Sequence, residues 1–432
     1  MQIKVLKNAG WIVGCKIIKA ILTVIVTAIT TRYLGVEKYG ILSYAAGLVA
    51  FAVPIMQLGL TGTMVHEIIN RPDDEGKVVG TVTGMTMLSS ILCIIGVISF
   101  SMIVNAGEKE TIIVCAVYSV MLFFNAFEMI RFWFHAKLMA KYSAMVMLIS
   151  YVAVTLFQVL LVALKANVYL FALSYSIDYF LIAIMLLAIF KKKSKSKLSF
   201  SFSLAKEMFK VSKFYIISSL MFVVFSQTDK IMLKLMAGDF ETGIYSAATT
   251  CATMVSFVFA AIIDSMRPEI FNARKESQAL FEKRMIELYS VLIYFSIIVC
   301  GVIALFAPLI IKIICGAQYF DAVFVLRIVV WMNVFSYIGT AKSIWLLAES
   351  KYKYLIILNF CGAIVNVALN FVLIPMLGAT GASITTIISQ FATNFLIGFL
   401  IKPIRRNSIL MLKGFDLKNL KSMFSNIKGN KE

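Results

Sequence analysis

Long apolar stretches separated by short polar turns run through the chain to about residue 402. Each stretch has roughly the 20 apolar residues that an α-helix needs to cross a bilayer. The pattern predicts twelve membrane spans, and it leaves no long soluble segment between them. We expect these spans over residues 11–33, 41–63, 78–104, 111–133, 143–165, 168–190, 211–236, 243–265, 288–312, 321–347, 354–376 and 378–402.

The composition supports a membrane protein and also predicts its orientation. The chain is 61% hydrophobic and only 15% charged, whereas soluble domains are about 45–50% apolar. Of its 41 lysines and arginines, 30 lie at the termini and in alternate loops or at the span ends beside them, against six in or beside the opposite loops. The positive-inside rule therefore predicts cytoplasmic termini for a multi-pass inner-membrane protein. The net charge of +19 then reflects topology and attraction to anionic lipids; dispersed cations do not favour nucleic acid.

The basic stretch 191–210 separates two halves of six spans each. A shift of 203 residues aligns 34–46 with 237–249 and matches Gly35 with Gly238. This match predicts a duplicated, parallel repeat whose binding site lies between the halves near the midplane of the membrane. The expected parts are 1–190, the cytoplasmic linker 191–210, 211–402 and a cytoplasmic tail over 403–432. The tail is basic and amphipathic, with an apolar face that comprises Ile409, Leu412, Leu420, Met423 and Ile427.

Lys16 and Lys19 lie inside the first span, where a charge is costly. Helical spacing places both on one face with Thr23, Thr27 and Thr30. This stripe favours a hydrated cavity beside the span. The alternative is that both lysines extend back to the cytoplasmic interface, since they follow Trp11 by only five and eight residues.

Other polar residues within or at the ends of spans are candidates for binding, coupling or gating. Ionisable side chains at depth rarely serve packing alone, whereas Ser, Thr and Asn also bond across helix interfaces. His66 and His135 have an alternative interpretation as interfacial residues without chemistry. The binding candidates are Lys16, Lys19, Arg32, Lys230, Arg327, Asn359, Asn366 and Asn370, and the coupling or gating candidates are Asp178, Asp229, Asp264, Glu128, Arg131 and His66.

The sequence lacks the usual motifs of catalysis. The seven cysteines lie almost all in spans without metal-binding spacing, and they are typical of apolar packing residues. There is no GxxxxGK[ST] or HExxH motif, and no nucleophile–base pair stands out. We therefore expect neither an enzyme nor a bound metal or cofactor.

Three segments carry a family resemblance: "RYLGVEKYGILSYAAGLVAFAVPIMQLGLTG", "VSKFYIISSLMFVVFSQTDKIMLKLMAGDFETGIYSAA" and "LNFCGAIVNVALNFVLIPMLGATGASITT". In this order they resemble the polysaccharide-transport family, specifically Wzx-type O-antigen or capsule repeat-unit flippases. That family belongs to the superfamily that also holds MATE exporters. The resemblance implies an all-α membrane protein with twelve helices in two six-helix lobes around a central cavity.

The resemblance also implies a substrate. It would be an undecaprenyl-diphosphate-linked oligosaccharide, moved from the cytoplasmic to the outer leaflet by alternating access for O-antigen, lipopolysaccharide or capsule. H⁺ or Na⁺ is a candidate coupling ion, and a polysaccharide polymerase and a chain-length regulator are candidate partners. Two alternatives stay open: a MATE-like ion-coupled multidrug exporter and a flippase for the lipid-linked peptidoglycan precursor.

Overall fold

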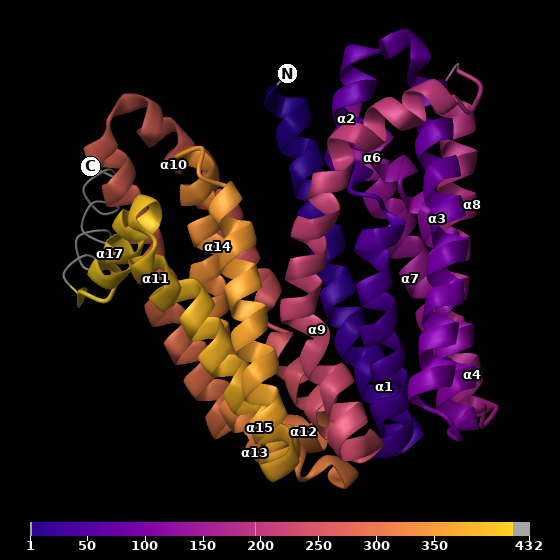
Figure 1. Ribbon diagram of the computed structural model, residues 1–432, viewed down its shortest axis with the longest axis vertical. Coiled ribbons are helices and arrows are strands. Elements are labelled where there is room, and N and C mark those ends of the chain that lie inside the picture. The colour runs from indigo at the N-terminus through magenta and orange to yellow at the C-terminus, as the bar shows by residue number, and fades with distance from the viewer. Residues whose placement is uncertain (1, 195, 418–432) are drawn as a thin grey trace. The chain divides into compact units, whose positions relative to one another are not determined.

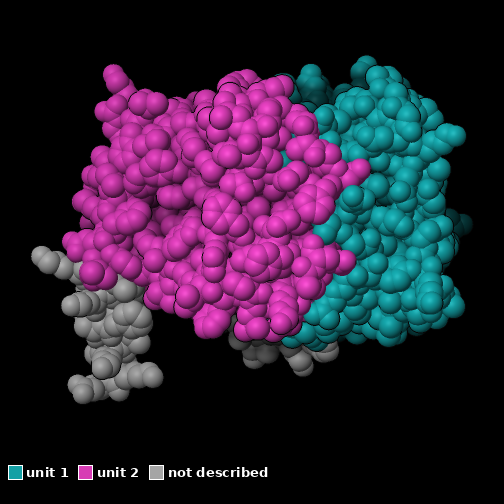
Figure 2. Space-filling view, turned by 90° about the horizontal axis from the view of Figure 1, so that it is seen from below, with its two compact units in different colours: residues 1–235 teal, residues 236–432 magenta. Residues whose placement is uncertain are grey.

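The structure of the protein is a computed structural model. It describes the backbone of residues 2–194 and 196–417 and the side chains of residues 14–15, 17–194 and 196–417. Its Cα packing divides the chain into two compact units, Met1–Leu235 and Met236–Glu432, which Figure 2 shows in teal and magenta. The domain limits expected from the sequence stay a prediction.

Within the described residues the chain is helical and has no β-strand, which confirms the predicted class (Figure 1). The first unit comprises α1 (Gln2–Met56), α2 (Leu60–Asn70), η1 (Pro72–Asp74), α3 (Glu75–Val104), α4 (Lys109–Ser119), α5 (Met121–Glu128), α6 (Ile130–Ala136), α7 (Ala140–Ala163), α8 (Val168–Lys193) and the first part of α9 (Phe202–Thr253). The second comprises the rest of α9, α10 (Ser256–Glu276), α11 (Gln278–Leu305), α12 (Ala307–Ile314), η2 (Ala317–Tyr319), α13 (Ala322–Val329), α14 (Met332–Ala348), α15 (Lys353–Phe391), the π-helical turn η3 (Ala392–Leu396), α16 (Ile397–Leu400), η4 (Lys402–Ile404) and α17 (Arg405–Gly414).

Nine helical segments of the described chain are long and apolar enough to cross a membrane, and the protein is a multi-pass membrane protein. Three of them, Ile17–Asn70, Phe202–Thr253 and Lys353–Leu400, contain a glycine at which the helix is broken. If each broken segment crosses twice, the total is twelve. The count of twelve spans stays a prediction.

The same backbone break occurs at two positions that the sequence repeat aligns. Gly35 has φ 77° and ψ 176°, and Gly238 has φ 87° and ψ −174°. Positive φ is cheap only for glycine, so these residues allow one helix to end and the next to begin without an intervening loop. At Gly35 the two arms of α1 turn back on each other (Figure 1). Nearly equal angles at matched positions support the duplication.

The linker between α8 and α9 lies against the first unit along α3. The main-chain N–H of Ser201 donates to Thr81 Oγ1 at 3.0 Å, and Ser194 Oγ donates to Glu75 Oε1 at 2.8 Å. A Cβ at Gly80 would lie 2.5 Å from the main-chain oxygen of Ser199, so this close approach requires glycine. The linker is therefore fixed to the unit that contains the site described below.

The tail begins with a helix that packs on the second unit. Tyr289 on α11 donates a hydrogen bond of 2.6 Å to Asn407, and Arg406 pairs with Glu282. The structure buries Asn407, Ser408, Leu410, Met411 and Gly414, whereas Leu412 is exposed. An apolar face that lies against lipid would be exposed in this way, and the interfacial helix stays a prediction. Leu420, Met423 and Ile427 lie outside the described residues.

Candidate functional site

A pocket of about 250 Å³, with basic side chains in an otherwise largely apolar lining, opens in the first unit between α1, α6 and α7. The first turns of α7 make room for it, because Ala140, Ser143 and Ala144 place small side chains on one helical face. Three basic residues line it: Lys19 from α1, and Arg131 and His135 from α6. Cys15, Met147 and Leu148 complete the wall.

Lys19 brings an exposed positive charge to this pocket. Its ammonium lies 4.9 Å from the centre of the Tyr151 ring, and the Tyr151 hydroxyl lies 3.0 Å from Thr23 Oγ1. No carboxylate of the described residues lies within 4.0 Å of the ammonium, so the aromatic ring is its main protein contact. The cation thus remains available to an anion in the pocket.

Arg131 is positioned by a carboxylate from the preceding short helix. Its Nη1 lies 2.6 Å from Glu128 Oε1, and Asn125 donates to Glu128 Oε2 at 3.2 Å. Glu128 is only 8% exposed. Glu128 balances the charge of Arg131, whereas the ammonium of Lys19 has no carboxylate of the described residues within 4.0 Å. The charge of Lys19 favours an anionic ligand.

Asp178 on α8 is a half-buried acidic residue of the same unit. The Ser150 hydroxyl on α7 lies 2.5 Å from Asp178 Oδ1 and 2.8 Å from the main-chain oxygen of Asp178. Tyr175, one turn earlier, packs against Tyr118 with ring centroids 4.7 Å apart. Asp178 is held by α7, the helix that also forms the pocket wall, but it does not line the pocket.

Of the predicted residues, the pocket brings together Lys19 and Arg131, with Glu128 behind Arg131. The Lys16 side chain lies outside the described residues. Arg32 is exposed, Asp229 is buried and Lys230 is half-buried, and none of the three lines the pocket. Five predicted residues belong to the second unit: Arg327 donates to the main-chain oxygen of Ala304, Asp264 pairs with Arg267, and Asn359, Asn366 and Asn370 are buried on one face of α15.

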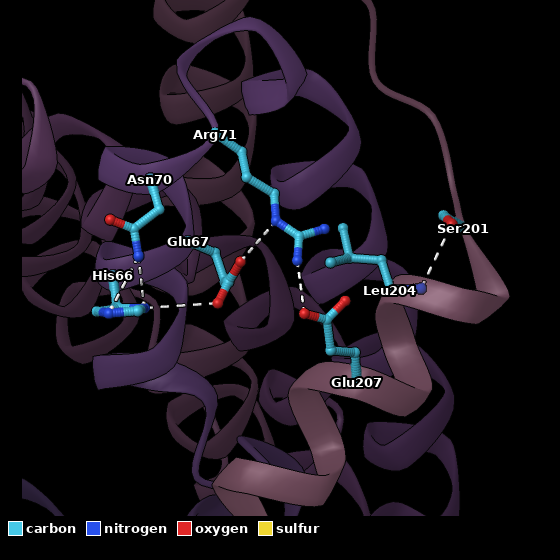
Figure 3. A network of polar contacts seen from close by, with 7 residues as sticks. All are labelled: His66, Glu67, Asn70, Arg71, Ser201, Leu204 and Glu207. Atoms are coloured by element: carbon cyan, nitrogen blue, oxygen red, sulfur yellow. Dashed lines mark hydrogen bonds and ion pairs between the residues drawn. The ribbon is translucent and has the colours of Figure 1, made fainter.

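His66 belongs to a polar network at the end of α2 (Figure 3). Its Nδ1 lies 3.5 Å from Glu67 Oε1, and Asn70 Nδ2 lies 3.1 Å from its ring nitrogens. Arg71 forms two ion pairs. Its Nε lies 2.9 Å from Glu67 Oε2, and its Nη2 lies 2.5 Å from Glu207 Oε1 of α9. The network connects α2 with the start of α9, which gives it a structural role in the first unit.

Two lysines inside apolar helices are absent from the predicted set. Lys234, in α9, is 5% exposed and lies 2.5 Å from Glu108, which precedes α4. Burial alone would raise the pKa of Glu108. Hydrogen bonds from Lys234 and Thr111, with the charge of Lys234, nevertheless hold that pKa below its ordinary value of 4.5. Lys342, in α14, is 2% exposed. A charged residue within an apolar span is the signal that identifies both.

Comparison with known proteins identifies the family. The model of the family described as "Polysaccharide biosynthesis protein" matches residues 5–274. The chain belongs to this family. The match confirms the family resemblance, and it covers the first two of the three sequence segments. A search of curated proteins by sequence finds no match.

Solved structures with the same fold are membrane transporters. An inward-facing multidrug resistance MATE family transporter of the MOP superfamily has a TM-score of 0.68 at 15% identity, over 90% of this chain and 95% of that chain. The lipid II flippase MurJ, in an inward closed conformation, has a TM-score of 0.69 at 15% identity, over 95% and 92%. A MOP superfamily transporter from Pyrococcus furiosus has a TM-score of 0.53 at 14% identity, over 94% of both chains. At such identities these likenesses establish the fold.

Proposed function

We propose that the protein moves undecaprenyl-diphosphate-linked oligosaccharides from the cytoplasmic to the outer leaflet of the cell membrane, for O-antigen, capsule or another surface polysaccharide. The observation that carries this proposal is the pocket lined by Lys19, Arg131 and His135 in a polysaccharide-biosynthesis membrane protein. A diphosphate is the part of such a substrate that is most costly to bring into a membrane. A cationic, hydrated pocket lowers that cost.

The two permanent cations suit the two phosphates in different ways. Lys19 is a flexible point charge that attracts a phosphate without demanding one geometry, whereas the planar guanidinium of Arg131 bonds two oxygens at once. Hydrogen bonds to charged groups contribute about 1.5–3 kcal/mol each. At about 30 Å³ per water, the pocket has room for about eight waters, so it accepts a headgroup only by releasing most of them.

Glu128 gives the pocket a means of gating. Its carboxylate holds Arg131 at 2.6 Å, in the way that an external anion would. An incoming phosphate competes with Glu128 for the same guanidinium, and this exchange of partners couples binding to the junction of α5 and α6. Glu128 and Arg131 are thus the gating pair in this proposal, and Lys19 is the residue that recruits the diphosphate.

The rest of the substrate needs different surroundings. The prenyl tail stays among lipid chains beside helices that expose side chains such as Leu92 and Ile103. Asn359, Asn366 and Asn370 are buried in α15 of the second unit, so their contact with sugar hydroxyls stays a prediction from the sequence. Alternating access would carry the headgroup across, with H⁺ or Na⁺ as the coupling ion and Asp178 as its candidate site.

The experiment follows export of the lipid-linked glycan in cells that depend on this protein. Lys19→Gln and Arg131→Gln should each lower surface polysaccharide at least 10-fold at normal protein levels, with lipid-linked repeat units accumulating in the inner leaflet. Lys206→Gln is the matched control, since Lys206 is an exposed lysine of the same unit and does not line the pocket. Normal export by both pocket variants would refute the proposal.

The two alternatives predict other cargo. A multidrug exporter would lower intracellular organic cations, but a positive pocket repels them. A peptidoglycan-precursor flippase would complement loss of that activity in growth assays. We expect neither drug efflux nor complementation, and either result would redirect the assignment.

A further inference from the structure

Lys342 is a buried cation without an acidic partner. It lies in α14, and its ammonium donates to the main-chain oxygen of Thr393 at 2.9 Å and to Asn394 Oδ1 at 3.3 Å. No Asp or Glu of the described residues lies within 4.0 Å of it. The arrangement belongs to the second unit and does not involve the pocket of the first.

Two neutral oxygens do not fully solvate an ammonium group. A lysine ammonium carries three donors, and the structure gives acceptors for two of them. Burying a charge is costly unless it is paired and fully hydrogen-bonded. The third donor therefore points to a further oxygen ligand near Thr393 and Asn394.

Three hydroxyls on the neighbouring helix also need partners. Thr385, Ser389 and Thr393 lie one turn apart, are at most 1% exposed, and make no side-chain hydrogen bond to any described residue. Their neighbours behave differently: Ser383 donates to Ala379 O at 2.9 Å and Thr386 donates to Ala382 O at 2.8 Å. Donation to the carbonyl four residues earlier is the usual local solution for a hydroxyl in a helix. The three unpartnered hydroxyls do not use it.

Thr393 links the ammonium to the three hydroxyls. Its main-chain oxygen accepts a hydrogen bond from Lys342, and its own hydroxyl is the last of the three unpartnered ones. It lies in the π-helical turn Ala392–Leu396 that interrupts the helix. A π-helical turn widens the helix, alters the main-chain hydrogen bonds and is frequent at functional sites. Asn394 in the same turn donates to Gln390 at 2.7 Å, which fixes the amide oxygen toward Lys342.

We propose that the second unit holds a chain of internal waters along Thr385, Ser389 and Thr393, and that this chain ends at the ammonium of Lys342. Side chains one helical turn apart are separated by about 5–6 Å, and two O–H···O bonds of about 2.8 Å span that distance. One water therefore fits between successive hydroxyls. Each water would have the two or more polar partners that internal waters need.

The ligand of this site is water, and its role is to solvate the Lys342 ammonium where no carboxylate does so. This proposal does not depend on whether the first unit binds a diphosphate. It also explains why three hydroxyls on one buried face forgo bonds to their own helix.

The experiment is a structure of the full chain at a resolution that shows water, together with thermal unfolding of variants. We expect ordered waters within hydrogen-bond distance of all three hydroxyls, one of them also bonded to Lys342 Nζ. Hydroxyls turned to the carbonyl four residues earlier, with no water between them, would overturn the proposal even if no variant folds.

The variants test the link to the ammonium. Removing the row with Thr385→Val, Ser389→Ala and Thr393→Val should lower the melting temperature, and adding Lys342→Met should recover part of the loss. The matched control, Ser383→Ala with Thr386→Val, removes hydroxyls that already have partners, and its effect should simply add to that of Lys342→Met. Additivity in both sets would contradict the proposal.

Discussion

The cationic pocket of the first unit and the interior of the second unit accommodate a lysine in an apolar helix in opposite ways. Lys19 is exposed and rests over Tyr151, whereas Lys342 is 2% exposed and is held by Thr393 and Asn394. Neither has a described carboxylate within 4.0 Å. An open cation can recruit a ligand from outside, while an enclosed one must be satisfied by the protein and its internal water. Exposure therefore suits Lys19 to ligand binding, whereas burial gives Lys342 a structural role.

Lys234 provides a third arrangement, because Glu108 pairs with it at 2.5 Å. Its ammonium is buried, like that of Lys342, but its partner is charged and half-exposed. The three lysines thus form a series of increasing dependence on the fold: Lys19, Lys234 and Lys342. Variants along this series test the comparison.

The largest effect should come from reversing the charge in the second unit. Lys342→Glu places a carboxylate against two oxygens that cannot donate, and leaving a charge buried without a partner costs about 3–5 kcal/mol. We expect little folded protein in the membrane, measured by fluorescence-detected gel filtration. Lys19→Glu should give normal amounts of folded protein that does not export glycan. Equal folded yields of the two variants would break the comparison.

Removing one member of the Lys234–Glu108 pair should have an intermediate effect. Lys234→Met leaves Glu108 able to reach water, whereas Glu108→Gln leaves a buried ammonium with a weaker acceptor. We therefore expect Glu108→Gln to be the more destabilising, by about 1–3 kcal/mol. Thermal unfolding of both single variants and of the double variant measures the coupling. If Lys234→Met destabilises the protein more than Glu108→Gln does, then packing of the lysine stem contributes more to stability than the ion pair.

The same pair predicts a pH dependence. The pKa of Glu108 is lower in the folded protein than its ordinary value of 4.5. The pair therefore stabilises the fold above that pH, and this contribution is lost as the pH falls through the folded pKa. The melting temperature in detergent should fall as the pH is lowered from about 5 through 4.5 and on toward the lower folded pKa. The fall should be smaller in Glu108→Gln, and an equal fall in both would assign the effect to other groups.

The smallest expected effect concerns the support beneath Lys19. Tyr151→Leu removes the ring from the ammonium, and such an exposed cation–π contact contributes about 0.5–1 kcal/mol. Half-saturation for the lipid-linked substrate in reconstituted vesicles should rise roughly 2- to 5-fold. Tyr151→Phe keeps the ring, loses the contact with Thr23, and should stay within about 2-fold. A stronger effect of Tyr151→Phe would mean that the hydroxyl positions the helix.

Parts of this picture follow from local sequence alone. Apolar stretches identify the helices, and the repeat around Gly35 and Gly238 identifies two positions with the same backbone break. Spacing also placed Lys19 on a polar face of its span. Lys342 carried a readable signal too, as a charge within an apolar stretch, but its significance depends on a π-helical turn 50 residues further along the chain.

By itself, the sequence determined that this is a helical membrane protein of the polysaccharide biosynthesis family, because hydrophobicity and glycine positions act locally along the chain. Only the tertiary structure decided which cations share a site. Lys19 and Arg131 are more than a hundred residues apart and meet through the packing of α1, α6 and α7, whereas Arg32, much closer to Lys19 in sequence, does not join them. The reason is physical: the partners of a charge are set by which helix faces pack together, and helix packing is not encoded at any single position.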